Sequence, residues 1–235
     1  MPLRAIGFDI DGTLYSAPSL YLRLMLKGLT RMRLLVAFNE VRHDLRNLIK
    51  SPEYRNRGIS GIAAFHRFQA ELTAKKLGAD PAVVHDAIES FFYTESLEPF
   101  TTIKPYVGVT RLLEDLRAKG LRLGAFSDFP CKRKLELLGL ADSFDVALTS
   151  EETGLVKPDC AGFDLMAKRL GVASEDIMYV GNSELYDVAG ALGAGMRAAL
   201  ITRKRFPASA AEFTFFDFAD LGRYIALHAN HEGAN

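Results

Sequence analysis

Two hydrophobic patterns divide the chain. Ala5-Ile6-Gly7-Phe8 is a short apolar run and predicts a buried strand over residues 4–9. From residue 17 to residue 98, apolar residues recur at spacings of three and four, which predicts amphipathic helices. Examples are the series Tyr21, Met25, Leu29, Met32, Val36, the series Ile59, Ile62, Phe65, Phe68, Leu72 and the series Val83, Val84, Ala87, Ile88, Phe91. Gly78-Ala79-Asp80-Pro81 predicts the end of one helix and the start of the next.

After Pro99 and Pro105 the pattern changes to strands that alternate with helices. The expected strands are Leu121–Phe126, Val146–Thr149, Ile177–Val180 and Arg197–Ile201, and the expected helices lie near Lys132–Leu138, Gly162–Leu170 and Leu185–Leu192. Short connections between such elements favour a parallel sheet with helices on both faces. We therefore predict an α/β fold: a Rossmann-like, doubly wound core of residues 1–16 and 99–235, with a helical cap of residues 17–98 inserted after the first strand.

The bulk composition is that of an ordinary globular protein. The 235 residues are 49% hydrophobic and 25% charged, and the formal net charge is zero. A neutral chain has no global attraction to nucleic acid or to membrane surfaces, so we expect neither as a partner. Residues 1–8 lack the features of a signal peptide, and two cysteines are too few for a disulfide framework. These observations favour a cytoplasmic protein, which we expect to be a monomer or a homodimer.

Polar clusters follow four of the expected strands. They are Asp9-Ile10-Asp11-Gly12-Thr13, Ser127-Asp128, Lys157-Pro158-Asp159 and Gly181-Asn182-Ser183-Glu184-Leu185-Tyr186-Asp187. In a parallel sheet the carboxyl ends of the strands meet at one edge, where ligands bind. The sequence Asp-x-Asp-Gly is also compatible with a simple turn. Two carboxylates on alternate residues, however, raise each other's pKa and call for a cation nearby.

In this order, the four clusters resemble motifs I to IV of the haloacid dehalogenase-like (HAD) hydrolase superfamily. The resemblance implies that Asp9 is a nucleophile that forms an aspartyl-phosphate, and that Asp11 is the general acid and base. It further implies that Ser127 and Asp128 bind the substrate, and that Lys157 keeps Asp9 ionised and neutralises the phosphate. Asp9, Asp11, Asn182 and Asp187 would hold magnesium (Mg2+).

Asn182 departs from the family pattern, which usually has Asp at this position. Magnesium prefers hard oxygen ligands with one or two carboxylates, so a neutral amide weakens the expected site. The departure keeps open a catalytically weakened binding protein of the same fold. It also keeps open a dehalogenase, although dehalogenases of the family usually replace the second motif I aspartate with Tyr, and here Asp11 is present. A sugar-phosphate mutase shares all four motifs. Glu184 is a candidate to compensate for the missing carboxylate, but its position at a helix start favours the simpler role of complementing the helix dipole.

The leading hypothesis is a magnesium-dependent phosphatase of a small phosphorylated metabolite, such as a sugar phosphate or a nucleotide monophosphate. Between residues 21 and 67, ten lysines and arginines stand against three acidic residues. Most of them suit the wet faces of helices. The alternative is that one or two arginines reach over the site toward an anionic substrate. Cys131 and Cys160 have no activating partner in the sequence, and we assign them no catalytic role.

Overall fold

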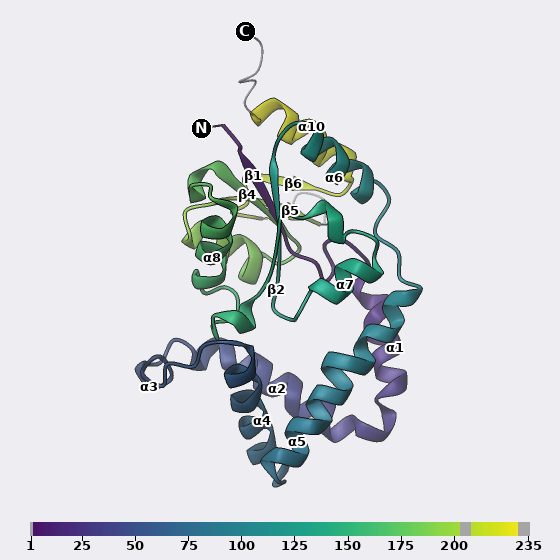
Figure 1. The fold of residues 1–235 in the computed structure, drawn as a ribbon, viewed down its shortest axis with the longest axis vertical. Helices are drawn as coiled ribbons and strands as arrows, with labels where there is room; N and C mark the ends of the chain where they lie inside the picture. Colours follow the sequence, from purple (N-terminus) through teal and green to yellow (C-terminus); the bar gives the residue numbers. More distant parts are fainter. Residues whose placement is uncertain (1, 203–207, 230–235) are drawn as a thin grey trace.

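A computed structural model of the protein describes residues 2–202 and 208–229. Its centre is a six-stranded, fully parallel sheet with the strand order β3-β2-β1-β4-β5-β6 (Figure 1). The strands are β1 (Ala5–Phe8), β2 (Arg122–Ser127), β3 (Val146–Thr149), β4 (Ile177–Gly181), β5 (Arg197–Ile201) and β6 (Phe213–Phe215). The sheet confirms the predicted Rossmann-like α/β core, because β1 pairs with β2 on one side and with β4 on the other.

Helices cover both faces of this sheet. They are α6 (Val109–Ala118), α7 (Lys132–Leu137), α8 (Ala161–Leu170), α9 (Ala189–Gly193) and α10 (Phe218–His228). Side chains alternate between the two faces of a strand. Thus Ile6 and Phe8 pack in one cluster with leucines of α6 and α10, whereas Ala5 packs in a second cluster with Phe163 and Met166 of α8. The core is therefore two apolar layers that hold the strand ends in fixed positions.

A second group of helices lies between β1 and β2 in the chain, at the end of the sheet opposite to the two termini (Figure 1). We call it the helical segment. It consists of α1 (Ala17–Lys27), α2 (Met32–Leu48), α3 (Pro52–Asn56), α4 (Ile62–Leu77), α5 (Pro81–Ile88), the π-helix η2 (Glu89–Thr94) and the 3-10 helices η1 (Leu29–Arg31) and η3 (Glu95–Thr101). Asp80 accepts hydrogen bonds from the amides of Ala82 and Val83, so the predicted restart is a capped helix start.

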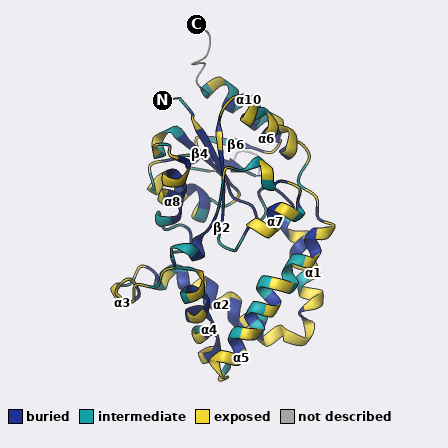
Figure 2. Ribbon diagram, in the orientation of Figure 1, coloured by how far each residue is buried: buried dark blue, intermediate teal, exposed yellow. Residues whose placement is uncertain are grey.

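The first predicted apolar series differs from a buried helix face. Its residues fall on α1, η1 and α2, since the first helix ends at Lys27 and Gly28 caps it. Tyr21, Met25 and Val36 are more than half exposed, and Figure 2 shows that α1 is largely exposed on its outer side. The series therefore forms a surface of the helical segment and not part of its packed interior. The predicted helix near 185–192 is also two pieces, the π-helix η7 (Glu184–Val188) and α9.

The remaining connections are short 3-10 turns: η4 (Ala141–Ser143), η5 (Ser150–Glu152) and η6 (Ser174–Asp176). Among the helices in the described part of the chain, none has both the length and the apolar character that crossing a bilayer requires.

Candidate active site

The predicted site residues converge at the carboxyl edge of the sheet. Asp9 follows β1 directly, and the turn after it returns so that the hydroxyl of Thr13 donates to Asp9 Oδ2 at 2.7 Å. Lys157, from the loop after β3, places Nζ 2.9 Å from Asp9 Oδ1. The two carboxylate oxygens of Asp9 thus have one hydroxyl donor and one cation, and the side chain is nearly buried.

Lys157 is a buried ammonium group surrounded by oxygens. Its Nζ lies 2.9 Å from Asp187 Oδ1, 2.6 Å from the Tyr179 hydroxyl and 2.9 Å from the Phe126 carbonyl, besides its contact with Asp9. Burial opposes the charge of Lys157, but the carboxylates of Asp187 and Asp9 raise its pKa well above the usual value. The pKa of Asp9 is raised to about 7, chiefly by burial. The negative charge of Asp187 also raises it, whereas the attraction of Lys157 lowers it. One cation is therefore shared by two carboxylates.

Asp11 sits in a separate set of contacts. Lys134 of α7 places Nζ 2.8 Å from both of its carboxylate oxygens, and Ser127 Oγ donates to Oδ2 at 2.9 Å. The Tyr15 hydroxyl donates to Oδ1. Although burial acts in the opposite direction, Lys134 lowers the pKa of Asp11, so this carboxyl rests in the ionised form. The two aspartates of the motif thus have different environments, which push their pKa values apart, as is typical of a pair in which each carboxyl has its own role.

Lys134 was not among the predicted site residues, yet the sequence contained a signal for it. Cys131, Lys134, Leu135 and Leu138 are all buried, at the spacing of one face of a helix. A lysine on an apolar helix face needs an anionic partner, because an unpaired buried charge is costly. Asp11 is that partner.

Asp128 faces the helical segment. Its Oδ2 accepts from Arg46 at 2.9 Å, its Oδ1 accepts from the backbone amide of Lys157 at 3.1 Å, and its carbonyl accepts from Arg42 at 2.6 Å. Both carboxylate oxygens of Asp128 are thus engaged by the protein. Its predicted role in substrate binding remains a prediction. The contacts here tie α2 to the loops that carry Ser127 and Lys157.

A buried polar network forms a second set of contacts between the helical segment and the core. Glu151, fully buried in η5, contacts Arg42 at 3.1 Å, His66 at 2.7 Å and the Tyr93 hydroxyl at 2.8 Å. Burial disfavours a charge on His66, but Glu151 and Glu89 raise the pKa of its imidazole. The arginine-rich stretch thus supplies Arg42 and Arg46 to contacts with the core.

The fourth cluster arranges its loop around Asp187. Oδ2 of Asp187 accepts from the amides of Asn182 and Ser183 at 3.1 and 3.0 Å, while Oδ1 holds Lys157. The side-chain amide of Asn182 lies 3.1 Å from the backbone carbonyl of Asp11. Glu184 accepts from Ser209 and from the amide of Ala210, so it ties η7 to the segment before β6.

The residues of this site fit a magnesium ion, but with one negative charge fewer than the usual ligand set, because position 182 is Asn. The Asp9 carboxylate, the Asp11 carbonyl and the side-chain oxygen of Asn182 are the oxygen donors that would hold it, and Asn182 lies beside that carbonyl, with its Nδ2 at 3.1 Å. Gly12 leaves the space open: its φ is +90°, and a Cβ built there would lie 2.1 Å from Asn182 Nδ2. Within the described ranges, no three carboxylate, imidazole or thiol groups gather as a metal cluster. Magnesium would thus depend on one carboxylate, that of Asp9, together with a backbone carbonyl, an amide oxygen and water.

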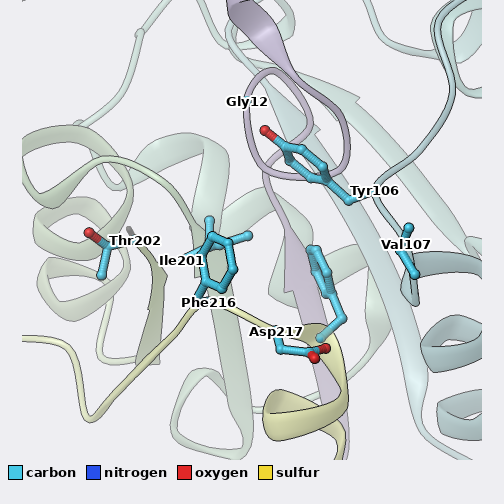
Figure 3. Close-up of a pocket in the computed structure, with 8 residues that line it drawn as sticks. Gly12, Tyr106, Val107, Ile201, Thr202, Phe216 and Asp217 are labelled. Carbon is cyan, nitrogen blue, oxygen red and sulfur yellow. The ribbon is translucent and has the colours of Figure 1, made fainter. Parts of the chain in front are cut away.

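A large cavity adjoins Asp11 between the core and the helical segment. Its volume is about 1140 Å³, and Asp11, Lys134, Arg46 and Tyr186 are among its lining residues. A smaller cavity, of about 330 Å³, lies on the other side of Gly12, between Tyr106 and the residues after β5 and β6 (Figure 3). Among the described residues that line the smaller cavity, Asp217 is the only charged one, and it caps α10. Of the two motif I aspartates, Asp11 lines the large cavity, together with Lys134.

Comparisons with known proteins agree with this geometry. A family model described as haloacid dehalogenase-like hydrolase matches residues 3–195. A glyceraldehyde 3-phosphate phosphatase of Methanopyrus kandleri is 32% identical over 87% of this chain and 86% of its own length. A phosphoglycolate phosphatase of Rhodospirillum rubrum is 29% identical over 95% and 91%. The crystal structure of a 2-haloacid dehalogenase from Pseudomonas syringae superimposes with a TM-score of 0.68 at 25% identity, covering 97% of this chain and all of the other.

Proposed function

Since the chain belongs to the haloacid dehalogenase-like hydrolases, we propose that it is a phosphatase that hydrolyses the phosphomonoester of a small metabolite through an aspartyl-phosphate. The observation that carries this proposal is the pair of differently supported carboxylates, with Lys157 on Asp9 and Lys134 with Ser127 on Asp11. Relatives named as phosphatases of glyceraldehyde 3-phosphate and of phosphoglycolate support the same reaction.

In the first half-reaction, an oxygen of Asp9 attacks phosphorus, and the bond between phosphorus and the alcohol oxygen breaks. Asp11 gives its proton to that oxygen, and the negative phosphate beside Asp11 raises its pKa enough for it to carry the proton. In the second half-reaction, the Asp11 carboxylate takes a proton from water, which attacks the phosphorus of the aspartyl-phosphate and frees Asp9. Lys134 favours the ionised form of Asp11 that this second step needs. Lys157 holds Asp9 in place and offsets the charge of the phosphoryl group.

Mg2+ would be held by the Asp9 carboxylate, the Asp11 carbonyl and the Asn182 side chain, and when bound it would neutralise phosphate charge and orient the phosphoryl group. Asp187 would act through the loop, by fixing the amides of Asn182 and Ser183. The helical segment would serve as the cap, because Arg42 and Arg46 join it to the loop after Ser127.

The proposal is tested by phosphate release from a panel of phosphomonoesters, with and without magnesium, for the parent and for Asp9→Asn. Asp9→Asn is expected to abolish release, while Asp142→Asn, a change of an exposed residue in the turn η4 that lines neither cavity, is expected to leave it unchanged. Chloride release from 2-chloropropionate provides the comparison with dehalogenase chemistry. Phosphate release by Asp9→Asn near the parent level, or chloride release in place of phosphate release, would overturn the proposal.

A further inference from the structure

The large cavity next to Asp11 is bigger than a two- or three-carbon ester requires. Its volume of about 1140 Å³ exceeds the roughly 300–1,000 Å³ of pockets that take drug-sized ligands. Because Asp11 lines this cavity and is the group proposed to protonate the leaving oxygen, the alcohol part of the substrate must lie in it. The lining residues therefore report on the chemistry of that alcohol.

The cavity has two apolar walls. The helices α1 and α2 provide the aliphatic wall, formed by Leu20, Leu24, Met25, Met32, Leu35 and Val36. The aromatic wall comes mainly from α2, η2 and η3 and consists of Phe38, Phe91, Phe92, Tyr93, Phe100 and Phe129. Phe38 and Phe92 stack with ring centroids 4.0 Å apart, so this wall is internally packed. Uncharged polar side chains, such as Asn39, Ser96 and Thr149, are fewer in the lining than these apolar ones, so a polar alcohol finds few hydrogen-bond partners along the two walls.

Part of the aliphatic wall is open to water. Met25 and Val36 of this wall are 57% and 52% exposed, and Tyr21, which also lines the cavity from α1, is 58% exposed. Contiguous exposed apolar surface on a folded protein marks a binding site, because leaving it in water costs free energy. An apolar ligand that covers these side chains would recover that cost.

The positively charged side chains that line the cavity indicate where the anionic end of a ligand would lie. Among the described lining residues, five are lysine or arginine and two are acidic, and Lys134 and Arg46 lie on the same side as Asp11. The Arg46 guanidinium lies 4.2 Å from the centre of the Tyr186 ring, so this cation is held at the wall of the cavity. A molecule with a phosphate at one end and an apolar body matches this distribution.

We propose that the substrate is the phosphomonoester of a hydrophobic alcohol, whose apolar body lies between the aliphatic and aromatic walls; this inference rests on the proposed phosphatase function. Each buried methylene contributes roughly 0.8 kcal/mol, or about fourfold in affinity, when it is fully removed from water. Because the walls are partly open to water, we expect affinity to increase roughly twofold to fourfold for each methylene added to the alcohol.

The experiment uses linear alkyl phosphates from ethyl to octyl, below their micelle concentrations, with glycerol phosphate and a hexose phosphate as polar esters of comparable length. kcat/KM is expected to rise along the alkyl series, with octyl phosphate at least about 50-fold above ethyl phosphate. Binding of the non-hydrolysable alkylphosphonates, measured by calorimetry, should follow the same order. This second measurement reports on the cavity without any turnover.

Two aspartate substitutions on α1 separate the cavity from the rest of the surface. Met25→Asp places a charge in the aliphatic wall and is expected to abolish the dependence on chain length in both measurements. Leu26→Asp is the matched control: Leu26 is 63% exposed on the same helix and is not a lining residue. It is expected to keep the parent's dependence.

A flat alkyl series, or polar esters hydrolysed better than octyl phosphate, would overturn the inference and leave the proposed function standing. An equal loss of the chain-length dependence in Met25→Asp and Leu26→Asp would overturn it as well. If both variants also dissociate a dimer, the apolar face is instead covered by a second copy of the chain. Conversely, phosphonate binding that increases with chain length, without hydrolysis of any ester, would support the cavity assignment and overturn the proposed function.

Discussion

Lys157→Met offers the sharpest test of the electrostatics at the strand ends. The substitution removes the buried cation between Asp9 and Asp187 and replaces it with an apolar side chain of similar length. Asp9 Oδ1 and Asp187 Oδ1 each lie 2.9 Å from Nζ. They are therefore within about 6 Å of each other, the range in which like charges raise each other's pKa.

The structure allows the loss to be sized. Removing one partner of a buried ion pair costs about 3–5 kcal/mol, since the other charge is left without compensation. Lys157 compensates two carboxylates and is almost fully buried, so we expect the upper part of this range at pH 8. Most of that cost should be recovered when Asp9→Asn and Asp187→Asn are combined with Lys157→Met, because no uncompensated charge then remains.

The dependence on pH has a definite sign. A carboxyl group whose pKa is raised in the folded state takes up a proton on folding, so stability increases as pH falls, by about 1.4 kcal/mol per pH unit. In the parent this increase begins only below about pH 7, the pKa of Asp9. Without Lys157 the pKa rises further, and the increase begins at higher pH. The loss caused by Lys157→Met should thus be at least about 1 kcal/mol smaller at pH 5 than at pH 8.

Urea unfolding in the presence of a metal chelator measures these free energies. Lys134→Met is the matched comparison, because Lys134 compensates a single carboxylate that is partly exposed and keeps donors from Ser127 and Tyr15. Its loss should be clearly smaller than that of Lys157→Met. A loss below about 1 kcal/mol for Lys157→Met, or a loss that is the same at both pH values, would refute the reasoning.

Three further substitutions address single residues of the site. Asp11→Asn should slow the hydrolysis of alkyl phosphates by roughly 10²–10⁴-fold and that of activated aryl phosphates much less, since aryl leaving groups need little protonation; equal losses in initial rate would contradict the acid role. Asn182→Asp should lower the magnesium concentration for half-maximal activity and destabilise the metal-free protein, as a magnesium titration of activity and melting temperature would reveal. Gly12→Ala should reduce activity and cost about 1 kcal/mol or more in urea unfolding, because φ is +90° and the new Cβ would meet Asn182.

Much of the fold follows from local patterns in the sequence. Five of the six strands begin or end within a residue of their predicted positions, because buried parallel strands are continuous apolar runs. The meeting of Asp9, Ser127, Lys157 and Asn182 also follows, since parallel strands all end at the same edge. The last strand, β6, is only three residues long and gives too weak a pattern. By contrast, α6 is not among the predicted helices although its sequence has a clear helical pattern: Val109, Leu112, Leu113 and Leu116 recur at spacings of three, one and three.

The contacts between side chains could not be predicted in the same way. The sequence identifies a basic stretch, but it does not indicate that Arg42 and Arg46 bind Asp128, because that depends on how α2 lies against the core. The series from Tyr21 to Val36 illustrates a second limit. Apolar residues at helical spacing appear alike in sequence whether they pack into a core or line a cavity, so only the tertiary arrangement tells the two apart.

The charges at the site explain why a neutral residue is tolerated at position 182. The site contains three carboxylates and two cations in two sets of contacts: Lys157 contacts Asp9 and Asp187, and Lys134 contacts Asp11. A fourth carboxylate at position 182 would double the negative excess and would have to be offset by a divalent ion for the fold to stay stable. With Asn182, the amide instead reaches the Asp11 carbonyl and closes the motif by a hydrogen bond. A neutral residue at position 182 therefore adds no further negative charge to the site, and the loop stays in place by a hydrogen bond of its own.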